Sequence, residues 1–297
     1  MEKKLKVMVP VDFTPVSLKA IEFLGLLMEK AAVEAHLVHI VQVNPAEWAG
    51  TTDASDTIDT HEIKAEEQWA ARQFEALQQQ EGFAFKSDII HGSLTTDLAR
   101  YASQHHTDLV VMGTEGAEGW LEKISGSEAQ HVVRHTDVPV ITIHQHASIT
   151  PIHNILWVAD FEAQKQPEHA VASIRKLQQL FGAKLHLLQI LEEEDEPKAQ
   201  RIKENMQRFA DDLQLQDYVL HLRRDYKVPA GVRNFNQEAE MDLVVIGTHA
   251  RKGIGHLFFG SVAETLVNHC IRPLLTYHLT YTRHIRGSPG ETTFLNS

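Results

Sequence analysis

Short apolar runs alternate with longer amphipathic segments along the whole chain, in two similar halves. The runs are rich in Val and Ile without strict polar alternation, which favours strands buried on both faces. The strands predicted in the first half are KVMVPVD, AHLVHIVQV, FKSDIIHG, DLVVMGT and VPVITIH. Those predicted in the second half are NILWVAD, KLHLLQIL, YVLHLRR, DLVVIGT and PLLTYH.

Helices are predicted between these strands. In the first half they lie near residues 17–31, 60–80, 94–106 and 126–136, and the second half repeats the arrangement. Alternating strands and helices with right-handed crossovers build a parallel sheet covered by helices on both faces. We therefore predict an α/β fold of two tandem doubly wound sandwich domains, each with a five-stranded parallel sheet. Ligands bind beyond the carboxyl ends of the strands in such sheets.

The two halves are also similar in sequence. DLVVMGTEG at 108–116 matches DLVVIGTHA at 242–250, and GSEAQHVVRHTDVPVITIH at 126–144 matches GSVAETLVNHCIRPLLTYH at 260–278. The first half has extra residues before its fourth strand, which we place in the loop at 44–57. The predicted boundaries are 1–147 for the first domain, 153–280 for the second and 281–297 for a C-terminal tail.

Composition narrows the functional classes. The chain has 297 residues, about two domains, with 43% hydrophobic and 23% charged residues and a net charge of −12. The negative charge argues against broad binding to nucleic acid or to an anionic membrane. No apolar run approaches the roughly 18 residues of a membrane span, and the N-terminus lacks a signal-peptide pattern. The single cysteine, Cys270, cannot form an internal disulfide, so we predict a cytoplasmic protein.

A glycine pattern follows the fourth strand of each half. The first half has G-x2-G-x9-G-S, formed by Gly113, Gly116, Gly126 and Ser127. Glycines let the backbone approach a ligand closely, and the Gly-Ser pair precedes a helix whose N-terminus attracts anions. The pattern therefore predicts a phosphate site. The second half has Gly247, Ala250, Gly260 and Ser261 at the matching positions.

The same residues also fit a structural role. Ser127 with Gln130, and Ser261 with Glu264, match the capping-box pattern, so each serine can cap its own helix. Gly113 can simply end a strand. A Walker A loop and a G-x-G-x-x-G motif after a first strand are both absent. Spacing alone leaves both interpretations open.

The duplicated five-strand pattern, the aspartate ending each first strand and the G-x2-G-x9-G-S loop together resemble the universal stress protein family. The resemblance covers about residues 5–145 and 153–279 and implies the strand order 3-2-1-4-5. Some family members bind ATP at this loop, and others lack the motif and do not bind it. For this chain the resemblance implies ATP as ligand, or AMP or ADP, with magnesium.

The resemblance also implies which residues face the nucleotide. Asp12, beside Pro10 and Val11, would face the adenosine, and Ile40 and Met112 would pack on it. The glycine-loop residues would hold the phosphates. The corresponding residues of the second half are Asp160, Ile190, Ile246, Gly247, Gly260 and Ser261. Each has a structural alternative, because Asp12 can cap the first helix or its preceding turn and the apolar side chains can be core.

Each half departs from an ideal site. The first loop carries Glu115, Glu118 and Glu122 against Lys123, and a carboxylate about 4 Å from a phosphate charge costs roughly 1–4 kcal/mol. The second loop is basic, but Ala250 replaces a glycine, and forcing an alanine into the left-handed conformation costs roughly 1–2 kcal/mol. We favour the first half because its glycines are complete.

Other chemistry finds little support. The 19 histidines form no HExxH or Cys–His motif, so no metal site is predicted. No nucleophile has a base at a recognisable spacing, so we expect a binding protein and not an enzyme. The apolar fifth strands would lie at sheet edges, which predicts an internal pseudo-dimer through them, with a homodimer as a further possibility. We expect a nucleotide-regulated stress protein with an unknown protein partner, or an interaction scaffold that binds no nucleotide.

Overall fold

The computed structural model of the chain describes residues 4–43, 60–94, 96–115, 132–133, 136–161, 167–249, 266 and 270–279. The first half contains β1 (Leu5–Pro10), α1 (Pro15–Lys30), β2 (Val33–Gln42), α3 (Thr60–Gln80), β3 (Lys86–Gly92), α4 (Thr96–Gln104), β4 (Leu109–Thr114) and β5 (Val140–His144). The second half contains β6 (Asn154–Val158), α6 (Glu168–Phe181), β7 (Lys184–Leu191), α7 (Glu196–Asp212), β8 (Tyr218–Arg224), α8 (Val228–Ala239), β9 (Leu243–His249) and β10 (Leu274–Leu279).

The predicted α/β alternation is confirmed. All ten predicted strands are present within a few residues of their expected bounds, and so are the helices expected near 17–31, 60–80 and 94–106. Most of the helix expected over 126–136 lies outside the described residues. No helix in the described ranges is both long and apolar enough to span a membrane.

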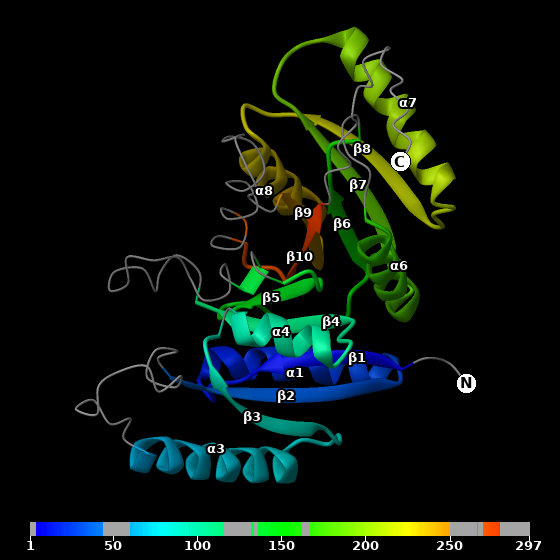
Figure 1. Cartoon of the computed structure of the whole chain (residues 1–297). Helices are drawn as coiled ribbons and strands as arrows, with labels where there is room; N and C mark the ends of the chain where they lie inside the picture. Colours follow the sequence, from blue (N-terminus) through cyan, green and yellow to red (C-terminus); the bar gives the residue numbers. More distant parts are fainter. Residues whose placement is uncertain are drawn as a thin grey trace, which may run out of the picture.

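The strand order is β3-β2-β1-β4-β5-β10-β9-β6-β7-β8, with parallel pairing inside each half (Figure 1). Each half therefore has the order 3-2-1-4-5. The two five-stranded sheets are not separate, because the fifth strands of the halves, β5 and β10, pair as expected, and their antiparallel pairing makes a single ten-stranded sheet. The edge of each half is completed by the other, which satisfies backbone groups that an open edge would leave to solvent.

The joint between the halves is symmetric. Thr142 lies opposite Leu274 and donates its hydroxyl to that residue's carbonyl at 3.3 Å. Thr276 lies opposite Val140 and does the same, also at 3.3 Å. His278 adds a contact by donating from Nε2 to the carbonyl oxygen of Val133 in the first half.

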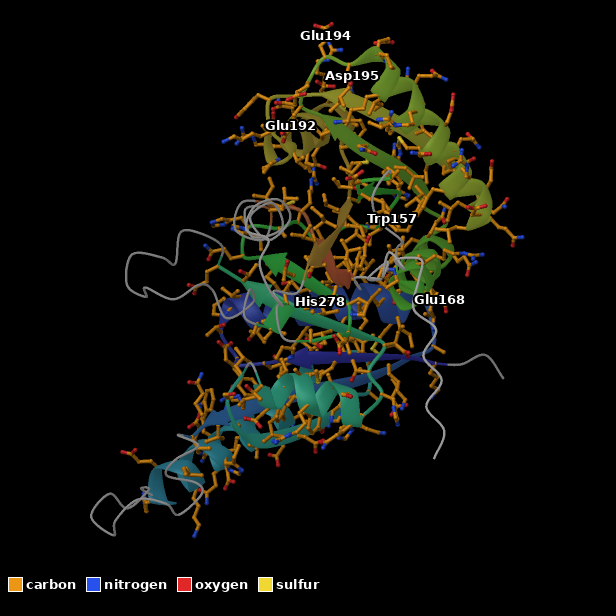
Figure 2. The ribbon with its side chains drawn as sticks, turned by 45° about the horizontal axis from the view of Figure 1, so that its top comes forward. Trp157, Glu168, Glu192, Glu194, Asp195 and His278 are labelled. Atoms are coloured by element: carbon orange, nitrogen blue, oxygen red, sulfur yellow. The ribbon has the colours of Figure 1, made fainter. Side chains whose placement is uncertain are left out.

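Two layers of helices cover the sheet, as Figure 1 shows. One core contains side chains from α1, α3, α6 and α7 and runs without interruption across both halves. The opposite face has two separate cores, one under α4 and one under α8. In Figure 2, Trp157 lies within the protein, whereas Glu192, Glu194 and Asp195 lie at its outer end, where all three are exposed. The acidic run is thus a solvated turn.

Local sequence explains where the helices begin and end. Thr14 is the N-cap of α1, accepting the backbone N–H of Ser17 at 3.3 Å, and Pro15 follows in the first turn. Asp195 caps α7 in the same way, accepting from the N–H of Lys198 at 2.9 Å. Gly182 ends α6 in the left-handed conformation, with φ of 60°, where glycine costs least.

Candidate functional site

The turn after β1 lies at the carboxyl edge of the sheet, beside β4. The order reverses here, because β2 lies on one side of β1 and β4 on the other. Pro10 and Val11 are buried in this turn, whereas Asp12 is exposed. The switch point of an open α/β sheet is where such folds bind ligands.

Asp12 takes part in the turn that starts α1. Its Oδ1 accepts hydrogen bonds from the backbone N–H of Thr14 at 3.0 Å and from the Thr14 hydroxyl at 2.7 Å. Burial raises the pKa of the Asp12 carboxyl, but hydrogen bonds from Thr14 and Ser17 together lower it by more. The net pKa is below its ordinary value, so the group is a carboxylate at neutral pH.

His39 of β2 supports this turn from below. Its Nδ1 donates to the carbonyl oxygen of Val11 at 2.8 Å, because a carbonyl can only accept. Its Nε2 is buried, makes no hydrogen bond in the part of the chain that the structure describes, and lies 3.4 Å from Oε1 of Glu66. The imidazole thus lies between the turn after β1 and Glu66 of α3.

Phe13 holds α3 against the turn. The residue has a φ of 62°, which is rare for a bulky side chain. Its ring centroid lies 5.4 Å from that of His39, 5.2 Å from Trp69 and 5.0 Å from Phe74, the last two on α3. These aromatic contacts offset the backbone strain and fix α3 beside the site.

The second half has the same turn with a different support. The registers pair Pro10 with Val38 and Val158 with Leu188, so the next residues, His39 and Gln189, are equivalent. Gln189 accepts from the backbone N–H of Phe161 at 3.0 Å and donates to Oδ1 of Asp160 at 3.2 Å. Asp160 is thus held by a neutral amide from β7, whereas Asp12 is held by Thr14.

Gly113, near the end of β4, lies against the first turn of α1. A Cβ built on it would lie 2.1 Å from the carbonyl oxygen of Val16. Gly247, near the end of β9, is close instead to a side chain, with 2.8 Å from an added Cβ to Cγ of Leu279. Only glycine fits at position 113 without a shift of the backbone. The close packing of Gly113 on α1 places the start of the glycine loop next to the turn that contains Asp12.

The apolar candidates lie below the site. Ile40 and Met112 are 9% and 5% exposed and belong to the core under α4. Ile190 and Ile246 are 8% and 1% exposed and belong to the core under α8. The remaining candidates, Gly116, Gly126, Ser127, Gly260 and Ser261, lie outside the described residues.

The sequence patterns missed the second layer of the site, formed by His39, Phe13 and Trp69 in the first half. One signal was available, because the dipeptide Asp-Phe ends the first strand of both halves, at Asp12-Phe13 and at Asp160-Phe161.

Histidines also form clusters away from the site. In the second half Nδ1 of His186 lies 2.9 Å from Nε2 of His221, and Nε2 of His186 lies 3.2 Å from Oδ1 of Asn154. In the first half the positions of His186 and His221 are taken by His36 and Asp88, whose Nε2 and Oδ2 are 2.7 Å apart. No three or more His, Cys, Asp or Glu side chains in the described ranges are placed to hold a metal ion.

The His186–His221 pair predicts a loss of stability in mild acid. Burial is the largest cause that lowers the pKa of both imidazoles. The charge of Lys184 lowers the pKa of His186 further, whereas Asp217 raises it. His186 and Arg223 lower the pKa of His221 further. Between about pH 7 and pH 5 the unfolded chain therefore binds more protons than the folded protein does. The free energy of unfolding then decreases as the pH is lowered. We expect urea unfolding to show a smaller loss over this range in a His186→Gln variant. The exposed His153→Gln control should match wild type; an equal loss in both variants would contradict the assignment.

Comparison with known proteins identifies the family. A model of the Universal stress protein family matches the chain over residues 5–144 and again over 151–278. The chain belongs to the universal stress protein family.

This universal stress protein is similar to members from archaea and bacteria. It is 24% identical over 139 residues to a universal stress protein of Methanocaldococcus jannaschii, which covers 46% of this chain and 81% of the relative. A solved universal stress protein from Archaeoglobus fulgidus has 17% identity and a TM-score of 0.69, covering 92% of this chain and 98% of its own. A Pseudomonas aeruginosa structure assigned to the family has 15% identity and a TM-score of 0.60, covering 92% and 93%. At these identities the two solved structures show the fold alone.

Proposed function

We propose that this universal stress protein is a cytoplasmic, non-catalytic stress-response regulator that binds an adenine nucleotide at the carboxyl edge of its sheet. The ligand is ATP, or ADP or AMP, with magnesium accompanying the phosphates. Binding to the loop after β4 alters a surface that a protein partner recognises.

One observation carries the proposal: the close approach of Gly113 to the first turn of α1. A Cβ there would meet the carbonyl oxygen of Val16 at 2.1 Å, so the glycine-rich loop starts at the switch point, beside Asp12. In a G-x2-G-x9-G-S loop that starts there, backbone N–H groups would bind the phosphates.

The first half is the better candidate. Its loop has all three glycines, and His39, Phe13 and α3 give the turn after β1 a fixed shape. The second half has Ala250 at the middle glycine position, although Arg251 and Lys252 make its loop more basic. We assign the stronger binding to the first half and a weaker or absent one to the second.

A second candidate function is an interaction scaffold that binds no nucleotide. Two contacts favour it, because each explains a motif residue without a ligand. Thr14 already occupies Oδ1 of Asp12, and helix packing already requires glycine at position 113.

The nucleotide proposal predicts that Gly116→Val weakens ATP binding by a factor of about ten or more, a loss of about 1.4 kcal/mol. A branched side chain there would obstruct the loop backbone that approaches the phosphates. Isothermal titration of the full chain with ATP and magnesium measures the effect. Gly260→Val should have a smaller effect, and Gly82→Val serves as a control because nothing lies within 4 Å of a Cβ at Gly82.

Mass spectrometry of the purified, denatured protein provides an independent test. Released ATP, ADP or AMP supports the proposal. If no nucleotide is released and titration with ATP and magnesium gives no heat, the scaffold function is correct. Wild-type binding that neither glycine substitution weakens would place the site elsewhere.

A further inference from the structure

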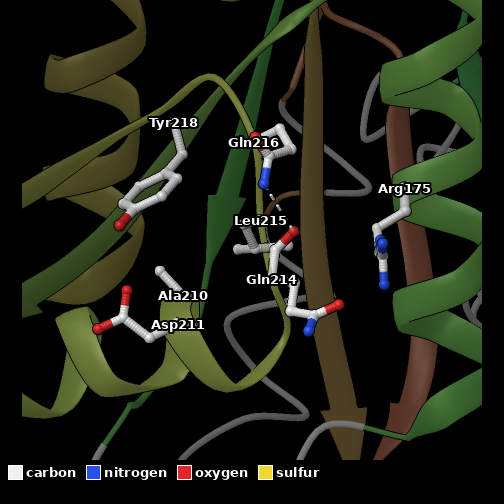
Figure 3. Close-up of a pocket in the computed structure, with 7 residues that line it drawn as sticks. All are labelled: Arg175, Ala210, Asp211, Gln214, Leu215, Gln216 and Tyr218. Carbon is white, nitrogen blue, oxygen red and sulfur yellow. Dashed lines mark hydrogen bonds between the residues drawn. The ribbon is translucent and has the colours of Figure 1, made fainter.

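A hollow of about 520 Å³ opens in the second half, at the edge of the sheet opposite the candidate nucleotide site (Figure 3). Tyr218, the first residue of β8, lies at this amino-terminal edge, whereas Asp160 follows the carboxyl end of β6. Arg175 of α6, Asp211 at the end of α7, and Gln214 and Gln216 of the connecting loop supply the polar lining. Buried Ala210 and Leu215 also line it.

The same corner of the first half is filled by aromatic side chains. The registers pair His36 with Lys86 and His186 with Val219, so the preceding residues, Phe85 and Tyr218, are equivalent. Two residues earlier, Phe83 corresponds to Gln216. The rings of Phe83 and Phe85 have centroids 6.4 Å apart.

The helices differ at the matching position too. The buried residues of α1 at 20, 21, 24 and 27 have the same spacing as those of α6 at 170, 171, 174 and 177. Gly25 therefore corresponds to Arg175. A Cβ on Gly25 would be 3.4 Å from Cε1 of Phe83, an ordinary contact, so the ring of Phe83 packs onto α1 at the position that Arg175 has in the second half. The second half has Arg, Gln and Tyr where the first has Gly, Phe and Phe, and its corner is hollow.

Some of the polar side chains that line the hollow make no hydrogen bond or ion pair with described residues of the protein. Arg175 makes no ion pair or hydrogen bond with any described residue, and the side-chain amide of Gln214 makes none either. Across the hollow, Gln207 donates to Oδ1 of Asp211 at 3.0 Å and to the hydroxyl of Tyr218 at 2.8 Å. A cation therefore faces one side of the hollow, and fixed oxygen acceptors line another.

The loop that contains Gln214 and Gln216 has a strained backbone conformation. Gln214 and Asp217 have φ values of 49° and 45°, and a left-handed non-glycine residue costs roughly 1–2 kcal/mol. Buried Gln178 fixes the loop by donating to the carbonyl oxygen of Gln216 at 2.6 Å. The corresponding residues 81–84 of the first half include no left-handed residue. Strain that the surrounding structure maintains is typical of binding sites.

We propose that this hollow is a second ligand site, which binds a free α-amino acid. The Arg175 guanidinium pairs with the ligand's carboxylate, since the two groups match in a bidentate geometry. Asp211 and the Tyr218 hydroxyl accept from the ammonium group, and the Gln214 and Gln216 amides bind a polar side chain. Asp211 repels a multiply charged anion such as phosphate. The volume lies within the roughly 300–1,000 Å³ usual for small-molecule sites.

The site is tested by titrating the full-length protein with each standard L-amino acid and with inorganic phosphate by calorimetry. At least one amino acid should bind with a Kd of about 1 mM or tighter, and its carboxamide should bind at least about tenfold more weakly. The double variant Arg175→Gly, Gln216→Phe copies the first half and fills the hollow, so it should lose binding while its circular dichroism is unchanged. Arg208→Ala, at an exposed arginine of α7, is the matched control and should bind as wild type does.

Three results would overturn the proposal: no amino acid binds, the double variant binds as well as wild type, or phosphate binds and amino acids do not. The nucleotide proposal is unaffected by any of them, because its site lies at the other edge of the sheet. If the double variant unfolds, Asp211→Asn takes its place. That change should weaken amino-acid binding and should not weaken the binding of propionate, which has no ammonium group.

Discussion

Replacing Trp157 with alanine is expected to lower the free energy of unfolding by about 3–5 kcal/mol. The side chain is 0% exposed on β6, within the core that runs across both halves. Its Nε1 donates to the hydroxyl of buried Tyr277 on β10 at 2.9 Å, and its ring packs edge-on against Phe209 at 5.2 Å. The substitution leaves a large cavity and removes the donor to Tyr277. Chemical denaturation of the full chain measures the effect.

Trp69 provides the matched control. It is 39% exposed on α3 and contacts Phe13 and His39 through ring edges. Trp69→Ala should cost less than half as much, since most of the cavity term is absent. A Trp157→Phe variant separates volume from hydrogen bonding, because the phenyl ring refills much of the space without a donor. Equal losses for Trp157→Ala and Trp69→Ala would show that Trp157 does not anchor the core.

The strands and helices were predictable from the sequence because the apolar runs that form them are local. The pairing of the fifth strands was expected as well, but not that it would be antiparallel and join the two halves into one sheet. The hydroxyls of Thr142 and Thr276 add to this pairing, since each reaches an opposing carbonyl at 3.3 Å across the joint. Both threonines lie inside apolar strands, where their type alone suggests only β propensity.

The candidate site was predictable in its first layer only. Asp12 and Gly113 stand out because each is an unusual residue at the end of an apolar run. His39 does not stand out, since it lies within a strand among other histidines, and its contact with Val11 becomes evident only from the register of β1 and β2. Its equivalence to Gln189 also depends on that register.

A glycine lies against an aspartate near the end of the third strand of each half. Gly92 ends β3 with a φ of 141°, and a Cβ there would lie 2.1 Å from Oδ2 of Asp97 on α4. The second half has Asp225 after β8 and Gly231 on α8, where a Cβ would be 3.1 Å from Cβ of Asp225. In each half the glycine leaves room for the side chain of the aspartate. The corner beside Arg175 differs between the halves instead: aromatic rings pack there in the first half, and polar side chains line a hollow in the second.

Gly113→Ala is expected to lower the free energy of unfolding by an amount near or above the upper end of the 1–3 kcal/mol that overpacking typically costs, about 3 kcal/mol. The added Cβ would lie 2.1 Å from the carbonyl oxygen of Val16 and 2.6 Å from its carbonyl carbon. These are backbone atoms in the first turn of α1, so the helix itself must move. Because Thr14 caps this turn and holds Asp12, the shift should also disturb the carboxyl edge of the sheet.

Alanine substitutions at two other glycines, measured under the same denaturation conditions, serve as controls for this loss of stability. Gly82 has nothing within 4 Å of an added Cβ, so Gly82→Ala should change the free energy of unfolding by no more than about 0.5 kcal/mol. Gly25 lies inside α1 with its added Cβ at an ordinary 3.4 Å from Phe83, so alanine should stabilise the protein there by roughly 0.5–1 kcal/mol. The expected order of stability is Gly25→Ala, then Gly82→Ala, then Gly113→Ala. If Gly113→Ala proves as stable as Gly82→Ala, α1 does not press on β4, and helix packing does not place the glycine loop beside Asp12.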